Sequence, residues 1–380
     1  MSFACGVERS LAGQPWRWRR GGGDDLSIPL VDQLLLARGV DSADLDRHRA
    51  PTIRAFLPDP SAFKDMDKAA ARLADAVEMG ESITIFGDYD VDGATSAALL
   101  VLLLRRLGAE PGTYIPDRLM EGYGPSGDAL VALKKAGAGL VITVDCGAQA
   151  FAALEAAAEA GLDVIICDHH QCAAELPRAY AIINPNRLDE NEDGAAHGHL
   201  AAVGMAFLLG VALLRELRRR GRFANGMAEP PILDLLDLVA LGTVADVARL
   251  HSLNRAFVAQ GLKVMAGGQN VGLAALAQAA RLVKAPTCRD LGFALGPRIN
   301  AGGRVGKSDL GVRLLTCTDP EEARTIAAEL DRLNEERRAI EMLVTEAAEQ
   351  QAAGSADPVV VVSGRGWHPG VIGIVAGRLK

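Results

Sequence analysis

Acidic and imidazole side chains follow three separate strand-like runs, and this is the most informative pattern in the chain. The runs 82–86, 140–144 and 163–167 are short, apolar and β-branched, as in a buried parallel strand. The carboxyl ends of parallel strands in an open α/β sheet face one crevice, where ligands bind. The side chains that follow the runs, and that we therefore expect to converge, are Asp88, Asp90, Asp92, Asp145, Asp168, His169 and His170.

Carboxylates gathered in this way would repel one another unless cations neutralised them. Oxygen ligands mixed with imidazole favour Mn²⁺, with Mg²⁺ as the alternative, and the lack of a thiolate set disfavours structural Zn²⁺. Asp88, Asp90 and Asp92 alternate in the sequence, so an extended backbone would point all three to one side. One ion cannot easily use every group in this cluster, and the sequence therefore predicts two divalent ions.

The elements that must position these residues alternate between strand and helix, which predicts βαβ units and a parallel sheet. We expect strands at 82–86, 112–116, 140–144, 163–167 and 181–184, and helices at 94–107, 127–136 and 148–160. A polar, Gly-rich loop, 189–199, comes next. Beyond it the pattern predicts helices at 200–220, 231–247 and 320–353, a strand at 358–363 and a helix at 370–380.

These patterns divide the chain into four parts: a mostly helical lead-in (1–80), a parallel-sheet domain (81–250), a helical region ending in a long connecting helix (251–355), and the start of a further domain (356–380). One strand and one helix cannot bury their own apolar faces. We therefore expect the chain to be a fragment of a longer protein.

Composition describes an ordinary α/β protein, with 49% hydrophobic and 4% aromatic residues. A net charge of −8 argues against a sheath of positive charge for gripping nucleic acid, but it leaves room for a local basic groove. The six cysteines show no paired spacing that would indicate disulfides or a zinc ribbon. With no signal-peptide pattern and no apolar run long enough for a bilayer, the sequence predicts a cytoplasmic protein.

Three familiar motifs match in part and fail in context. Residues 88–93 fit the first half of a calcium-binding EF-hand loop, but position twelve is Leu99 and a strand precedes the loop. Residues 122–127 match the dinucleotide-binding fingerprint, but six residues separate Pro116 from Gly122 and Pro125 removes an amide. Residues 303–308 resemble the end of a P-loop, but position 301 is alanine and no strand precedes them.

Two further places carry residues that suit phosphate chemistry. Arg298 and Arg304 stand among glycines, so backbone and guanidinium groups could hold a phosphate there; a Gly-rich turn with solvated arginines is the alternative. Asp246 ends an apolar helix, where negative charge is unfavourable next to the helix dipole. That misfit makes a metal-binding role plausible for Asp246.

Taken in order, these segments resemble the DHH phosphoesterase superfamily, named for the Asp-His-His found here at 168–170. The matching segments are 87–93, 143–147, 168–170 and 242–246. Within that superfamily the chain is similar to the RecJ family of single-strand-specific 5′→3′ exonucleases, through residues 115–118 with 122–124, 296–304 and 367–373. RecJ proteins continue past this point with the rest of a second domain and an OB-fold.

The resemblance implies a DHH catalytic domain, a helical region, a connecting helix and the start of a DHHA1-like domain. It implies hydrolysis of phosphodiester bonds in single-stranded DNA from a 5′ end, releasing 5′-mononucleotides in repair and recombination, with a single-strand-binding protein and a helicase as partners. A family member acting on small nucleotides or oligoribonucleotides is the alternative. The implied metal ligands are Asp90, Asp92, Asp145, His169 and Asp246, with Asp88 as a ligand or a partner of one; the implied catalytic residues are His170 and Asp168, and the implied phosphate contacts are Arg118, Arg298, Arg304, His368 and Gly370.

Overall fold

The computed structural model describes residues 3, 6–17, 28–118, 120–224, 226–354 and 357–379. Parts of the predicted lead-in (1–80) and of the last predicted segment (356–380) lie outside these residues. The chain separates into two compact units, Met1–Phe56 and Leu57–Lys380. Within its described residues, the first unit contains short helices: α1 (Leu30–Ala37), η2 (Ser42–Asp44), α2 (Leu45–Arg49) and α3 (Ile53–Phe56).

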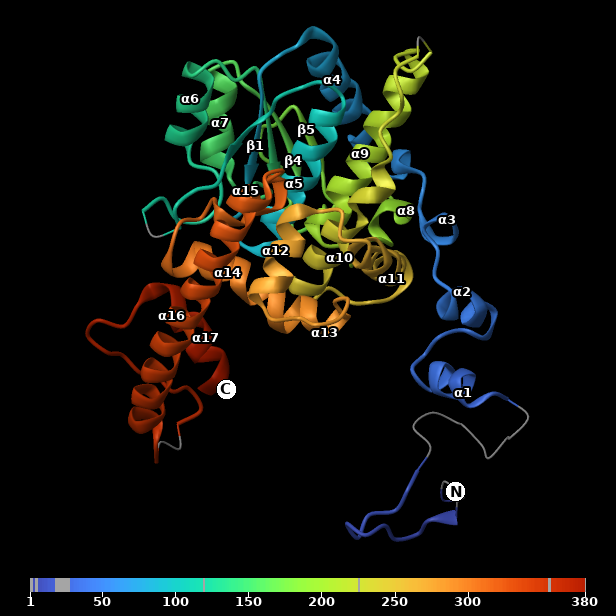
Figure 1. The fold of residues 1–380 in the computed structure, drawn as a ribbon, viewed down its shortest axis with the longest axis vertical. Helices are drawn as coiled ribbons and strands as arrows, with labels where there is room; N and C mark the ends of the chain where they lie inside the picture. The colour runs from blue at the N-terminus through green and yellow to red at the C-terminus, as the bar shows by residue number, and fades with distance from the viewer. Residues whose placement is uncertain are drawn as a thin grey trace. The chain divides into compact units, whose positions relative to one another are not determined.

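A five-stranded parallel sheet forms the centre of the second unit (Figure 1), which confirms the predicted α/β class. Its order is β2-β1-β3-β4-β5. The chain moves outward from β1 to β2 on one side and from β3 through β4 to β5 on the other, so the strand order reverses between β1 and β3. Such a reversal is where α/β sheets bind ligands. The strands are β1 (Ile83–Gly87), β2 (Gly112–Tyr114), β3 (Leu140–Val144), β4 (Asp163–Cys167) and β5 (Ala181–Ile183).

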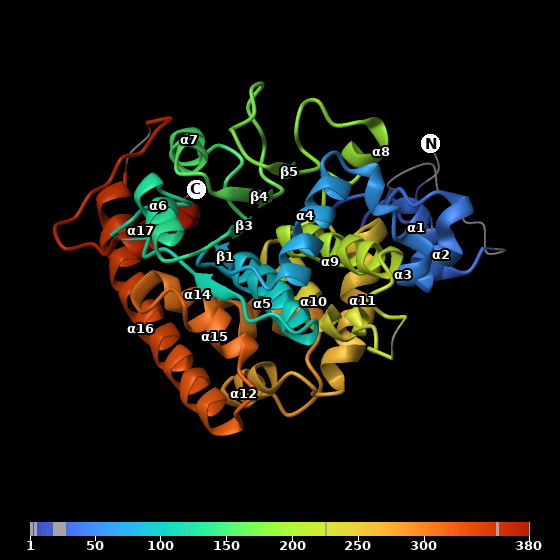
Figure 2. The same ribbon diagram turned by 90° about the horizontal axis from the view of Figure 1, so that it is seen from above.

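Helices cover both faces of the sheet (Figure 2). On one face, α6 (Gly127–Lys135) and α7 (Phe151–Glu159) enclose a core that includes Val141 and Ile166. On the other face lie α5 (Val91–Arg106) and α9 (Ala202–Arg219), and α5 is buried along nearly its whole length because α9 and later helices pack against it. Preceding elements are η3 (Pro60–Ala62) and α4 (Met66–Met79), and α8 (Glu192–Ala195) lies in the predicted polar loop.

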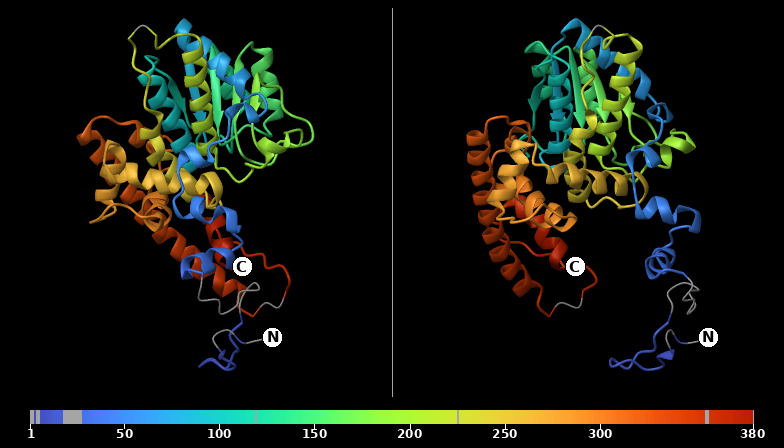
Figure 3. Two further views of the ribbon diagram at one scale, coloured as in Figure 1. Left: turned by 90° about the vertical axis from the view of Figure 1, so that its right-hand side faces the viewer. Right: turned by 45° about the vertical axis from the view of Figure 1, so that its right-hand side comes forward.

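The rest of the second unit is helical, as predicted. A 33-residue helix, α16, runs along this region with α17 beside it (Figure 3). Pro320 at its first position and Asp319, whose side chain accepts a hydrogen bond from the Glu321 amide, explain where α16 begins. The elements are η4 (Ile232–Leu235), α10 (Leu236–Ala245), α11 (Ser252–Ala266), α12 (Val271–Ala279), α13 (Cys288–Asp290), the π-helix η5 (Leu291–Leu295), α14 (Gly296–Val305), α15 (Leu310–Thr316), α16 (Pro320–Ala352) and α17 (Pro369–Leu379).

One expected strand, and one alternative considered for another segment, were wrong. Residues 358–363 form no strand, because no neighbouring strand in the described chain supplies partners for their backbone groups. Residues 296–305, considered as a Gly-rich turn, form helix α14. Among the described residues, no helix has the length and apolar character needed to cross a membrane.

Candidate metal centre

The loop after β1 and the end of β3 meet where the order of the strands reverses. Asp88 follows β1 directly and Asp145 follows β3 directly; both are buried. The loop after β1 folds back so tightly that a Cβ on Gly93 would lie 2.4 Å from the Asp88 carbonyl oxygen, which only glycine avoids. Asp90 caps the following helix by accepting a 3.0 Å hydrogen bond from the Gly93 amide.

We expected an extended backbone to point Asp88, Asp90 and Asp92 to one side. That expectation was wrong for Asp92, because helix α5 already begins at Val91. Its carboxylate instead accepts hydrogen bonds from the amides of Ala202 (2.6 Å) and Val203 (2.9 Å). These amides begin helix α9, whose own N-cap residue offers no side-chain oxygen. Asp92 therefore joins the start of α5 to the start of α9 and is almost fully buried.

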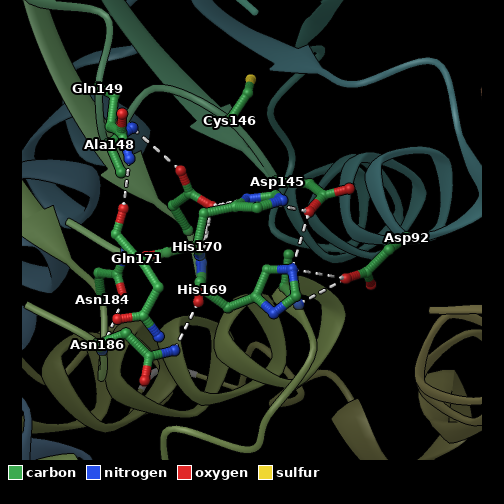
Figure 4. Close-up of polar contacts among 12 residues, drawn as sticks. Asp92, Asp145, Cys146, Ala148, Gln149, His169, His170, Gln171, Asn184 and Asn186 are labelled. Carbon is green, nitrogen blue, oxygen red and sulfur yellow. Dashed lines mark hydrogen bonds and ion pairs between the residues drawn. The ribbon is translucent and has the colours of Figure 1, made fainter. Parts of the chain in front are cut away.

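His169 is held with one ring nitrogen facing the carboxylates (Figure 4). Its Nδ1 lies 3.0 Å from the Leu200 carbonyl oxygen, which can only accept, so Nδ1 carries a proton and Nε2 is the nitrogen that faces the carboxylates. Nε2 lies 3.2 Å from Asp145 Oδ1 and 3.8 Å from Asp92 Oδ2. A backbone carbonyl that fixes the far nitrogen is the usual support of a metal-binding histidine.

Buried acceptors without partners provide the test of whether a cation fits. Asp88 Oδ1, Asp145 Oδ1 and His169 Nε2 are all buried and accept no hydrogen bond. An unpaired buried acceptor is costly, and divalent cations bound between these side chains would satisfy them. Three sets of residues bring ligand atoms within 4.8 Å of one another: Asp88, Asp90 and Asp145; Asp92, His169 and Asp246; and Asp145, His169 and His170. Oxygen mixed with imidazole suits Mn²⁺ or Mg²⁺.

The electrostatics of the carboxylates agree with this fit. Burial, and after it repulsion from Asp90, raises the pKa of Asp88 to about 8. The same causes raise the pKa of Asp92 and of Asp145 well above the ordinary range, with Asp246 as the first repelling neighbour of Asp92 and Asp92 as that of Asp145. The ionised site is therefore unfavourable by itself, and a bound cation would relieve the repulsion.

Asp246 reaches the centre because helix α10 packs very closely against α5. A Cβ on Gly242 would lie 2.3 Å from Thr95 Oγ1 and 3.0 Å from Asp92 Oδ1, so this contact needs glycine. Asp246 follows α10 directly, and its Oδ2 lies 4.0 Å from His169 Nδ1. Burial raises the pKa of Asp246 as well.

Asp168 and His170 form a separate hydrogen-bonded pair. Asp168 is buried and accepts hydrogen bonds from His170 Nδ1 (2.7 Å) and from the amides of Ala148, His169 and His170. Burial alone would raise the pKa of Asp168, but these hydrogen bonds outweigh it and the pKa is lowered. The hydrogen bond to Asp168 raises the pKa of His170, so the pair favours an ionised acid and a protonated imidazole.

Most of the proposed phosphate contacts, all except Arg298, lie near Tyr89 or at the start of α17. The guanidinium of Arg118 lies 4.8 Å from the centre of the Tyr89 ring. Arg304 Nη1 donates to the Gly370 carbonyl (3.0 Å), and the Gly370 amide donates to His368 Nδ1 (3.0 Å). Burial and the nearby charge of Arg118 lower the pKa of Arg304.

Arg298 is engaged elsewhere. Its Nε donates to Asp331 Oδ1 (2.8 Å) and its Nη1 to the Ala294 carbonyl (2.7 Å), so it ties α14 to α16. The glycines near it also have a packing reason: a Cβ on Gly303 would lie 2.3 Å from the Tyr89 ring. Helix α14 thus lies directly against the loop that carries the first carboxylates.

Three asparagines that support the centre were missed by sequence reasoning. The side-chain amide of Asn184 donates to the His170 carbonyl (2.9 Å) and that of Asn186 to the His169 carbonyl (2.6 Å). Asn300 Oδ1 accepts from the Val91 amide (3.1 Å). The pair of asparagines directly after β5 was a usable signal, because they follow a strand end like the carboxylates; Asn300 gave none.

Carboxylates and histidines at the switch point of a parallel sheet, with a helical region behind them, define a class of α/β protein built around bound divalent cations. A model of the DHH family, N-terminal domain, matches residues 82–243. The chain belongs to the DHH family.

Individual proteins that are similar to this chain over most of its length include RecJ proteins. The single-stranded-DNA-specific exonuclease RecJ of Bacillus subtilis strain 168 is 40% identical over 358 residues, which cover 92% of this chain and 43% of that protein. A crystal structure of exonuclease RecJ bound to manganese is 36% identical with a TM-score of 0.72, covering 83% of this chain and 77% of that one. A crystal structure of RecJ from Thermus thermophilus in complex with Mg²⁺ is 32% identical with a TM-score of 0.62, covering 83% and 41%. The chain thus spans less than half the length of the Bacillus relative.

Proposed function

We propose that this chain carries the catalytic centre of a metal-dependent exonuclease that degrades single-stranded DNA from a 5′ end and releases 5′-mononucleotides. One observation carries the proposal: buried, unpartnered acceptors on Asp88, Asp145 and His169 converge at the sheet's switch point. The names of the relatives support the choice of DNA and of single strands. The 5′→3′ direction rests on the resemblance to RecJ alone.

The chain's own residues suit two adjacent divalent ions, Mn²⁺ or Mg²⁺. Asp88, Asp90 and Asp145 would hold one, and Asp92, His169 and Asp246 the other, with Asp145 close enough to His169 to contact both. A bound divalent cation supplies positive charge that polarises a phosphate and makes an attacking water more acidic. The hydrogen bonds from Ala202 and Val203 to Asp92 fix one wall of the site before substrate arrives.

His170 is the proposed proton donor. Asp168 accepts from its Nδ1, which leaves Nε2 of this half-exposed side chain to donate toward a phosphate or a leaving oxygen. Arg118, Arg304 and His368, with the start of α17 at Gly370, are the proposed contacts of the terminal 5′-phosphate. Arg298 would act indirectly, by fixing α14 on α16.

An assay of four substrates tests this function. 5′-Phosphorylated single-stranded DNA, the same sequence as a duplex, a short RNA and pyrophosphate are each incubated with Mn²⁺ and with EDTA, using a label at either end of the DNA to read direction. We expect Mn²⁺-dependent loss of mononucleotides from the 5′ end of the single strand. Preferred turnover of the short RNA or pyrophosphate would replace this function by the small-substrate alternative, and turnover in EDTA would exclude the metal centre.

A further inference from the structure

A short segment before helix α9 supports two of the proposed metal ligands at once. The Leu200 carbonyl accepts from His169 Nδ1, and the amides of Ala202 and Val203 donate to Asp92. We call residues 199–203 the α9 entry. A displacement of the α9 entry would turn the His169 ring and release the Asp92 carboxylate together.

A second short segment follows a third proposed ligand, Asp246, in the helical region. Asp246 ends α10, and the chain then passes through 247–251, which we call the α10 exit, before α11 begins. Val247 has a φ of 59°, a left-handed conformation that is unusual for a β-branched residue. The Ala248 amide returns to the Thr243 carbonyl (3.2 Å), which closes the end of α10. A strained exit needs outside contacts to stay in place.

One buried side chain joins these two segments. Asn254, in the first turn of α11, is fully buried, and its Nδ2 donates to the His199 carbonyl (2.7 Å) and to the Arg249 carbonyl (3.1 Å). Two carbonyls can only accept, so the nitrogen of this amide must face them. The His199 and His251 rings stack at 4.1 Å as a second contact between the same segments. Burial and the neighbouring His251 and His197 lower the pKa of His199 to about 4, so its ring is neutral in this contact at pH 7.

We infer that Asn254 is a positioning residue for the metal centre: by bridging the α9 entry and the α10 exit, it sets the separation of His169 and Asp92 from Asp246. The inference rests on the proposed function, because it takes these three residues as ligands. Asn254 itself touches none of them. Its role is to keep ligands from distant parts of the chain in register, as hydrogen bonds behind a metal ligand do in other sites.

Asn270 provides a matched control elsewhere in the second unit. Its Nδ2 donates to the Leu315 carbonyl (3.0 Å) and its Oδ1 accepts from the Leu273 amide (2.9 Å), so it bridges α12 and the end of α15. Neither helix carries a proposed ligand. Removing either amide should lower the urea midpoint of unfolding to a similar extent, because buried partners lose their hydrogen bonds.

The experiment measures Mn²⁺ affinity by isothermal titration calorimetry and unfolding by urea in EDTA, for the wild type, Asn254→Ala and Asn270→Ala. We expect Asn254→Ala to weaken Mn²⁺ binding about 10-fold or more, within the range seen for groups behind metal ligands. Asn270→Ala should lose stability and keep wild-type Mn²⁺ affinity. If Asn254→Ala does not fold, Asn254→Ser, which keeps one donor, is measured in its place and should show a smaller loss of affinity.

The outcomes separate this inference from the proposed function. Wild-type Mn²⁺ affinity in Asn254→Ala, or equal weakening in Asn254→Ala and Asn270→Ala, would overturn the positioning role. A wild-type protein that binds Mn²⁺ but degrades no nucleic acid would overturn the exonuclease proposal and leave the positioning role standing.

Discussion

Two buried carboxylate sites in this protein differ in where their positive charge comes from. Glu341 on α16 is 2% exposed and forms ion pairs with Arg337, one turn along the same helix, and with Arg378 of α17. Asp145, at the carboxyl end of the central strand β3, is also 2% exposed, but among the described residues its only partners at ion-pair distance are His169 and His170. The chain thus supplies the cations for Glu341 and leaves Asp145 without a permanent one.

The difference separates a structural site from a binding site. Around Glu341, paired charges and the apolar contacts of Val344 and Ala348 with Val371 and Val375 hold α17 on α16. Around Asp145, imidazoles are the only partners at ion-pair distance among the described residues, and no arginine or lysine pairs with it. A buried carboxylate without a permanently charged partner is expensive, so its presence indicates that something outside the chain completes the site.

The replacement Asp145→Asn should have the largest effect among the tests of this comparison. Asparagine keeps the volume and tolerates the φ of 60° at this position, so the change removes charge and little else. We expect Mn²⁺-dependent hydrolysis of single-stranded DNA to fall at least about 100-fold, beyond the loss typical of groups behind a metal ligand. The unfolding free energy in EDTA should not fall, since a repelled buried carboxylate is removed. Unchanged turnover would take Asp145 out of the metal centre.

The opposite result is expected for Glu341→Gln. Without this carboxylate the Arg337 guanidinium, with a side-chain exposure of 12%, loses its counter-charge in a buried setting. The unfolding free energy measured in urea should fall by about 3 kcal/mol, while Mn²⁺ affinity stays at the wild-type value. Glu349→Gln, an exposed position on the same helix, is the control and should change stability by less than about 0.5 kcal/mol. A loss of Mn²⁺ affinity in Glu341→Gln would show that the two sites are not independent.

The sequence alone predicted the parts of this comparison that depend on local patterns. Apolar runs such as 140–144 identify the buried strands, so the parallel sheet could be predicted. Residues such as Asp145 follow these runs directly, so the gathering of acids at the carboxyl ends of the strands could be predicted as well. The strand predicted at 358–363 fails because a strand depends on a neighbour, which a local pattern does not reveal.

Contacts between distant segments could not be predicted. Asp92 is fixed by amides more than a hundred positions later, and Asn254 reaches back to the His199 carbonyl. Arg298 looked like a phosphate ligand, but its partner Asp331 lies on another helix. Each of these depends on how helices pack, and no spacing within one segment encodes it.

A third buried carboxylate, which among the described residues has no arginine at ion-pair distance and no place in the metal centre, gives the most specific test. Asp237 on α10 is 3% exposed and accepts a 2.8 Å hydrogen bond from the Leu238 amide. Burial raises its pKa to about 6 from an ordinary value of 3.8. A raised carboxyl pKa means that the folded state holds its proton to a higher pH than the unfolded chain does. The contribution of Asp237 to the unfolding free energy is therefore complete below about pH 4 and is lost as the pH rises through about 6.

Asp237→Asn should therefore raise the unfolding free energy at pH 8 by about 3 kcal/mol, with little change at pH 4, because the amide cannot ionise. Urea titrations at both pH values measure this. Since Asp237 belongs to none of the sets of candidate metal ligands, the gain at pH 8 should be the same with Mn²⁺ and with EDTA. Asp145→Asn should behave differently, because Mn²⁺ stabilises only the wild type at that site. If the gain from Asp237→Asn disappears when Mn²⁺ is added, Asp237 is coupled to the metal centre, and the distinction drawn here between Asp237 and Asp145 is wrong.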